Sequence, residues 1–87
     1  MSDKNLHYQN VSITTKELTT AWSDITPASD VAKMSIRATG TFKLASSSSP
    51  GSEYMTIPSG TQFDYEGSGD LYASMPKAGV AQLCKYS

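Results

Sequence analysis

The acidic residues of the stretch "DYEGSGD" are the first that could do chemistry, because carboxylates spaced around glycines are typical of calcium-binding loops. The stretch holds Asp64, Glu66 and Asp70. An EF-hand loop needs the order D-x-[DN]-x-[DN]-G followed by a distant glutamate, and this stretch does not have it. We therefore interpret Asp64 and Glu66 as solvated residues on the wet face of a strand and predict no metal site.

Nucleophilic catalysis is the second chemistry to consider, and its residues are few. His7 is the only histidine and Cys84 the only cysteine of the chain. A Cys-His or Ser-His-Asp arrangement needs its base held within hydrogen-bond reach, and His7 lies in the polar N-terminal arm, which we expect to be the least ordered part of the chain. One cysteine cannot form an intramolecular disulfide and does not make a zinc cluster. We predict no catalytic residue, no cofactor and no enzymatic activity.

Aromatic side chains could instead bind a partner. Tyr54 and Tyr72 alternate with apolar neighbours and so are predicted on the opposite strand face from them. Exposed tyrosines of β-modules bind sugars or partner chains, although an ordinary position at the rim of a sheet would give the same pattern. We predict that Tyr54 and Tyr72 bind a partner, together with His7 and Tyr8 of the N-terminal segment.

Two stretches of alternating residues supply the elements that would position these side chains. In "MSIRATGTFKLA", residues 34–45, apolar and polar residues alternate on both sides of a glycine. The pattern predicts a β-hairpin that turns at residues 38–41. The stretch 54–66 predicts a second hairpin, which turns at residues 58–60 and places Phe63 and Tyr65 on the core side of its returning strand.

The remaining segments also favour short strands and turns. Residues 11–22 predict strands on which Trp22 anchors the core, and the last strand covers residues 80–86. The serine-rich tract 46–53 predicts an exposed flexible loop. No segment has a convincing helical period.

The fold class follows from this pattern. About eight short strands separated by Gly, Pro and Ser turns are typical of β-sandwiches and barrels. We predict an all-β protein with one antiparallel β-sandwich over residues 11–87 and a flexible N-terminal arm over residues 1–10. The pattern leaves a jelly-roll and an immunoglobulin-like strand order both open.

Composition limits the function classes. Of 87 residues, 38% are hydrophobic, and the formal net charge is −1 with the basic residues scattered singly. Nucleic acids and anionic membranes are bound by concentrated positive charge, so neither is an expected partner. No stretch approaches the ~20 apolar residues of a membrane-spanning helix. We expect a soluble protein that is made in a reducing cytoplasm.

The stretch from residue 19 to residue 86 resembles small β-sandwich proteins of tailed-phage virions. The resemblance rests on a tryptophan before "SDIT", a strand that ends in "SIRATG", an "IPSG" turn before an aromatic strand, and the closing segment "LYASMPKAGVAQL". These are generic sheet and turn motifs, and none of them is a catalytic residue.

The resemblance implies a structural role in the virion. Such proteins decorate or cement capsids, or serve as accessory pieces of the head, neck or tail, usually as symmetric oligomers. The expected partners are therefore the major capsid protein or other virion proteins and further copies of this chain, with the N-terminal arm as a tether. The alternative from another class is a carbohydrate- or receptor-binding module of a phage fibre or attachment device, which would use the same tyrosines for stacking.

Overall fold

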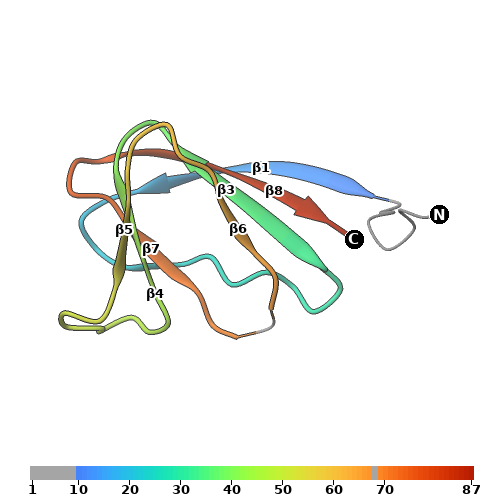
Figure 1. Ribbon diagram of the computed structural model, residues 1–87, viewed down its shortest axis with the longest axis horizontal. Coiled ribbons are helices and arrows are strands. Elements are labelled where there is room, and N and C mark those ends of the chain that lie inside the picture. Colours follow the sequence, from blue (N-terminus) through green and yellow to red (C-terminus); the bar gives the residue numbers. More distant parts are fainter. Residues whose placement is uncertain (1–9, 68) are drawn as a thin grey trace.

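The computed structural model describes residues 10–67 and 69–87, and these fold into eight strands without a helix (Figure 1). No helix of the described residues is therefore long and apolar enough to cross a membrane. The strands form two antiparallel sheets of four strands each. The predicted all-β sandwich is confirmed.

Each sheet combines strands from distant parts of the chain. Sheet 1 has the order β1-β8-β3-β6, and sheet 2 has the order β2-β7-β4-β5. The strands of sheet 1 are β1 (Val11–Leu18), β8 (Gly79–Tyr86), β3 (Lys33–Ala38) and β6 (Phe63–Tyr65). The strands of sheet 2 are β2 (Ser23–Asp24), β7 (Tyr72–Ser74), β4 (Phe42–Ala45) and β5 (Met55–Ile57).

The pairing is nested from the outside of the chain inward. β1 pairs with β8, β2 with β7, β3 with β6 and β4 with β5, all antiparallel. A long hairpin that is rolled up so that its strands alternate between two sheets gives this order, and the order is that of an eight-stranded jelly roll. The strand order thus decides between the two sandwich types that the sequence left open.

The core lies between the inner faces of the two sheets. Phe42, Leu18, Met34 and Ile36 are its largest fully buried side chains. They come from both sheets, and each alternates with exposed or polar neighbours as the period of two requires. Ile25 and Met75 lie outside the strands and extend the same cluster.

Both predicted hairpins are wrong. β3 and β4 lie in different sheets, as do β5 and β6, so the segments 38–42 and 57–63 cross from one sheet to the other. At the first crossing, the amide of Thr39 donates to the carbonyl oxygen of Val80 at 2.9 Å, and the amide of Val80 donates to Oγ1 of Thr39 at 3.1 Å. These bonds hold the chain on β8 where it leaves sheet 1.

The hairpin between consecutive strands forms at the serine-rich tract instead. β4 and β5 pair antiparallel on either side of residues 46–54, with Leu44 opposite Met55. The turn inside this loop is closed by a bond from the amide of Glu53 to the carbonyl oxygen of Pro50 at 3.0 Å. Gly51 has a φ of 63°, a left-handed conformation that favours glycine.

Trp22 is not a core residue, which corrects the prediction made for it. β1 ends at Leu18, which is buried, and the chain crosses to sheet 2 before β2 begins at Ser23. Ser23 lies opposite the buried Ala73 and therefore faces inward, so Trp22, one residue earlier, falls on the outer face. The half-buried indole packs there against Tyr54.

Candidate functional site

The outer face of sheet 2 carries both tyrosines that the sequence singled out. Tyr72 lies opposite Asp24 and Ala45 on the neighbouring strands. Tyr54 precedes Met55, the partner of Leu44, and so points away from the core side. The structure therefore places both tyrosines on one face, from strand β7 and from the residue before β5.

Trp22, Lys43, Tyr54 and Tyr72 make up what we call the aromatic face. The ring centroids of Trp22 and Tyr54 lie 5.8 Å apart at an angle of 53°, which is within the range of favourable aromatic pairs. Nζ of Lys43 lies 4.7 Å from the centre of the Tyr54 ring, as in a cation-π contact. Sequence reasoning missed Trp22 and Lys43 as members of this surface.

The aromatic side chains cover the middle of sheet 2. Ser74 and Ala45 both point outward, as their pairing with Lys43 and Tyr72 requires. They are nevertheless buried, with 4% and 7% of their surface exposed. Because outward-facing residues of a solvated sheet are normally wet, their burial indicates that the aromatic face is packed and ordered.

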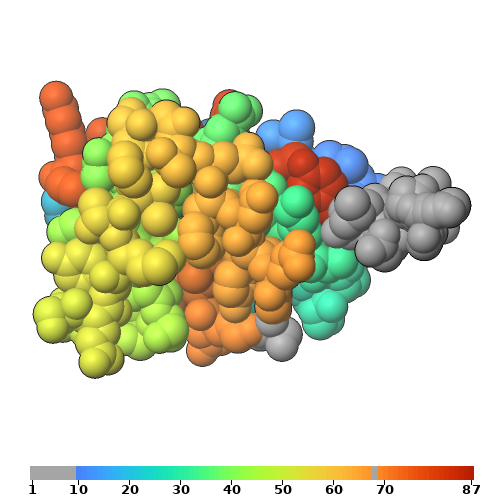
Figure 2. Space-filling view, in the orientation of Figure 1, coloured from blue at the N-terminus to red at the C-terminus, as the bar shows by residue number. Residues whose placement is uncertain are grey.

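An apolar groove adjoins the aromatic face at Tyr54. It has a volume of about 330 Å³ and lies at the edge of the sandwich where β5 and β6 come together. Figure 2 shows the yellow surface around β5 directly beside the orange surface around β6. The groove is lined by Leu44, Ala45, Ser46, Glu53, Tyr54, Met55, Phe63, Tyr65 and Leu71.

Exposed and half-buried apolar side chains make the surface of this groove hydrophobic. Met55 is 48% exposed and Tyr54 38% exposed, and both line the groove. Phe63 and Tyr65 are partly buried and pack against the core, so they belong both to the core and to the wall of the groove. The hydroxyl of Tyr65 donates to the carbonyl oxygen of Gly69 at 2.8 Å, which fixes this wall.

Asp64 organises the outer face of sheet 1. Its Oδ1 accepts hydrogen bonds from Oγ of Ser35 at 2.8 Å and from Nε2 of Gln62 at 3.0 Å, and its Oδ2 lies 3.8 Å from Nζ of Lys33. The Ser35 bond, followed by the Gln62 bond, holds the pKa of the Asp64 carboxyl below its usual value. The first acid of "DYEGSGD" thus links β6 to the side chains of Ser35 and Lys33 on β3.

We expect Asp64→Asn to weaken the dependence of stability on acid pH. A carboxyl whose pKa is lowered in the folded state stabilises the protein above its unfolded pKa of about 4, and this contribution is lost as the pH falls through the folded value. The melting temperature of the variant, followed from pH 6 to pH 2 by circular dichroism, should therefore fall less steeply than that of the wild type. Some pH dependence should remain in the variant, because hydrogen bonds from Thr26 lower the pKa of the Asp24 carboxyl as well.

Ser35→Ala is the matched variant for this prediction, since it removes the strongest donor and keeps the carboxylate. In this variant, too, the melting temperature should fall less steeply between pH 6 and pH 2 than in the wild type. An unchanged slope in both variants would contradict the assignment of the lowered pKa to this contact.

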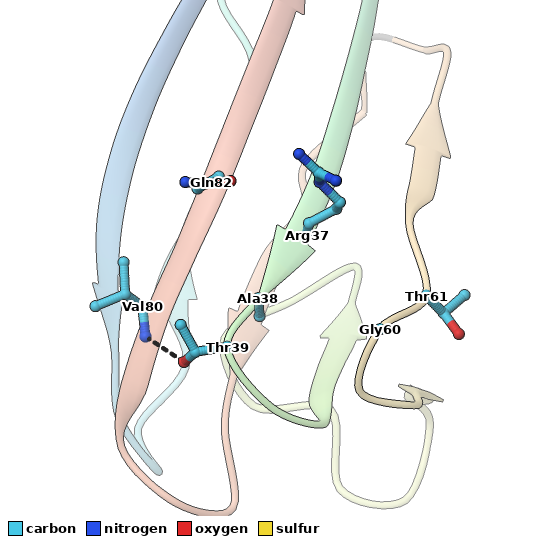
Figure 3. A pocket seen from close by; sticks show the side chains of 7 residues that line it. All are labelled: Arg37, Ala38, Thr39, Gly60, Thr61, Val80 and Gln82. Carbon is cyan, nitrogen blue, oxygen red and sulfur yellow. Dashed lines mark hydrogen bonds between the residues drawn. The ribbon is translucent and has the colours of Figure 1, made fainter.

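A polar hollow of about 380 Å³ lies farther along sheet 1 (Figure 3). Arg37 of β3 and Gln82 of β8 are directly opposite each other there, and Gly60 and Thr61 of the crossing segment form the far side. The exposed guanidinium and amide are hydrogen-bond donors for a carboxylate or a hydroxyl group. Among the described residues, its lining includes the threonines Thr39 and Thr61 but no His, Cys, Asp, Glu or Lys side chain.

Cys84 and two residues of the N-terminal segment are the remaining candidates from the sequence. Cys84 is a free, half-buried thiol on the outer face of sheet 1, and its hydrogen bond with Tyr86 raises the pKa of the Tyr86 hydroxyl. In residues 10–67 and 69–87, no three His, Cys, Asp or Glu side chains gather as metal ligands would. The candidates His7 and Tyr8 lie outside the described residues.

No protein-family model matches this chain, and no match is found among the curated proteins or among the solved structures.

Proposed function

We propose that this chain is a non-enzymatic structural protein of a tailed-phage virion, made in the host cytoplasm, that decorates or stabilises the capsid. The resemblance of residues 19–86 to small virion proteins supports the virion as its location. The jelly-roll strand order adds support, because viral capsid domains use this architecture, although lectins and cupins use it too.

The observation that carries the binding function is the junction of the aromatic face with the apolar groove at Tyr54. Trp22, Tyr54 and Met55 form one continuous apolar surface that is bounded by Lys43 and Glu53. Aromatic residues inside a polar boundary are typical of interface centres, where tryptophan and tyrosine supply most of the binding energy. The proposed occupant of this surface is the major capsid protein or another virion protein.

The location is tested on particles of the phage that encodes the chain. Mass spectrometry of purified virions should detect the chain at a fixed ratio to the major capsid protein, and the purified chain should co-sediment with capsids that lack it. A chain that is absent from virions and stays in the supernatant would overturn the proposal.

We expect Tyr54→Ala to weaken capsid binding by about 30-fold, since losing an aromatic residue at an interface centre costs about 2 kcal/mol. The bound fraction in a sedimentation titration measures this loss. Trp22→Ala should weaken binding as well, because the indole supports the Tyr54 ring.

Tyr86→Ala on the outer face of sheet 1 is the matched control. It removes a tyrosine that also lies near a lysine, with Nζ of Lys33 5.6 Å from the ring centre. Melting temperatures close to that of the wild type in all three variants would exclude unfolding as the cause of weaker binding. Equal losses in Tyr54→Ala and Tyr86→Ala would count against the aromatic face as the capsid contact.

A carbohydrate-binding module is the second candidate, favoured by the exposed Tyr54 ring beside an indole and a lysine. A sugar would stack on these rings and take hydrogen bonds from the polar side chains around them. Binding on a glycan array that is lost in Tyr54→Ala and Tyr72→Ala, without co-sedimentation with capsids, would favour this function over the first.

A further inference from the structure

The four sheet edges of the molecule differ sharply in length. The edge strands β6, β2 and β5 have three, two and three residues, whereas β1 has eight. Short edges offer few free backbone groups and so resist pairing with another chain. Figure 1 shows β1 beside β8 along the upper side of sheet 1, which makes β1 the one long edge among the described strands.

β1 also has little of the chemistry that protects an edge strand. Val11 and Ile13 are 58% and 68% exposed, and every residue of the strand except Leu18 is exposed. The strand has no proline or glycine, and its register with β8 runs through eight consecutive pairs without a bulge. Its charges, Lys16 and Glu17, both lie at one end.

The pairing with β8 fixes which backbone groups of β1 are free. Asn10 and Ser87 exchange both amide-to-carbonyl bonds, at 2.9 and 3.0 Å. In an antiparallel ladder, such double-bonded pairs recur at every second residue. The even-numbered residues of β1 therefore bond to β8, and Val11, Ile13, Thr15 and Glu17 direct their amides and carbonyls away from the sheet.

We propose that a second copy of this chain pairs with β1, antiparallel and about a two-fold axis at Thr14. Val11 then lies opposite Glu17 of the other copy, and Ile13 lies opposite Thr15. All four outward-facing residues pair with one another, and the two four-stranded sheets become one continuous sheet. Two-fold pairing requires a self-complementary edge, and this edge meets that condition.

Registers centred on neighbouring residues satisfy fewer groups. An axis at Ile13 leaves Glu17 without a partner inside the strand, and an axis at Thr15 leaves Val11 without one. The Thr14 register also sets Lys16 opposite Ser12, so the two lysines lie four residues apart along the strands, or about 13 Å, beyond the screening length of about 8 Å at physiological salt. An axis at Thr15 would bring these lysines to about 7 Å.

This interface shares no residue with the aromatic face or the apolar groove, so it stands apart from the capsid-binding proposal. Sedimentation equilibrium should show a species of twice the chain mass of 9.3 kDa that forms as the concentration rises. Thr15→Pro removes an amide that points away from β8, so it should abolish the dimer and keep the fold. Its capsid binding and melting temperature separate a lost dimer from a lost function or a lost fold.

A cysteine scan in a Cys84→Ser background tests the register. Opposed residues of a non-hydrogen-bonded pair have Cα atoms about 4.5 Å apart, which suits a disulfide, so Thr14→Cys should form a linked dimer under mild oxidation. Thr56→Cys, an exposed position on β5, gives the rate of random collision. A monomer at all concentrations, or linkage of Thr14→Cys no faster than that of Thr56→Cys, would overturn the proposal. Faster linkage of Ile13→Cys or Thr15→Cys would overturn the register.

Discussion

Phe42→Ala is expected to lower the free energy of unfolding by about 3 to 5 kcal/mol. Phe42 begins β4, has no exposed surface and is among the largest fully buried side chains. Removing its ring takes away apolar burial and leaves a cavity between the two sheets, because the surrounding structure relaxes only in part. Small domains have total stabilities of about 5 to 15 kcal/mol, so this loss would be a large share of the total.

Urea titration followed by circular dichroism measures this loss. Phe63→Ala is the control, since the same ring is removed from a position that is only half-buried at the wall of the groove. Phe63→Ala should lower the free energy of unfolding clearly less than Phe42→Ala does. Equal losses at the two positions would contradict the placement of Phe42 at the centre of the core.

Gly79→Ala is expected to cost about 1 to 3 kcal/mol, because one methyl group would overpack the start of β8. A Cβ at this position would lie 2.6 Å from Oγ1 of Thr39 and 2.9 Å from Cε of Met75. Oγ1 of Thr39 accepts the amide of Val80, so pushing this side chain aside also breaks a bond at the crossing from sheet 1 to sheet 2.

Gly40→Ala is the matched control for Gly79→Ala. A Cβ there would meet the same Cε of Met75 at 3.5 Å, an ordinary contact distance. Thermal unfolding of the two variants should therefore separate them, with the lower melting temperature in Gly79→Ala. Equal melting temperatures of the two variants would contradict this prediction and would show that Thr39 and Met75 can move aside without loss of stability.

The period of two predicted much of the core, but neither the exposure of Val11 and Ile13 on β1 nor which strands pair. Leu71, Ala73 and Met75 share a buried face as the sequence indicates. A hairpin and a crossing between two sheets both place apolar residues on the inner side of consecutive strands, so the alternation around Gly40 fits either. The strands that pair with β3 are β6 and β8, which lie far along the chain, so the local pattern does not identify them.

Part of the candidate site was within reach of the sequence. Tyr54 and Tyr72 were singled out by their alternation with apolar neighbours, and the structure places them on one outer face. Trp22 was assigned to the core because threonines occupy both strand faces before it. Its spacing of three from the buried Ile25 was the signal that it faces the other way, since residues three apart on an extended chain point to opposite sides. No pattern in the sequence marked Lys43 as part of the aromatic face.

The nested order of the strands also determines how the chain can acquire its structure during synthesis. Among the described strands, β1 is translated first and pairs with β8, which is translated last, so sheet 1 cannot close until the intervening strands have been made. Folding dominated by such distant pairs takes milliseconds to seconds. Until β8 has been made, β1 has two free edges instead of one, and neighbouring nascent chains can pair along either of them.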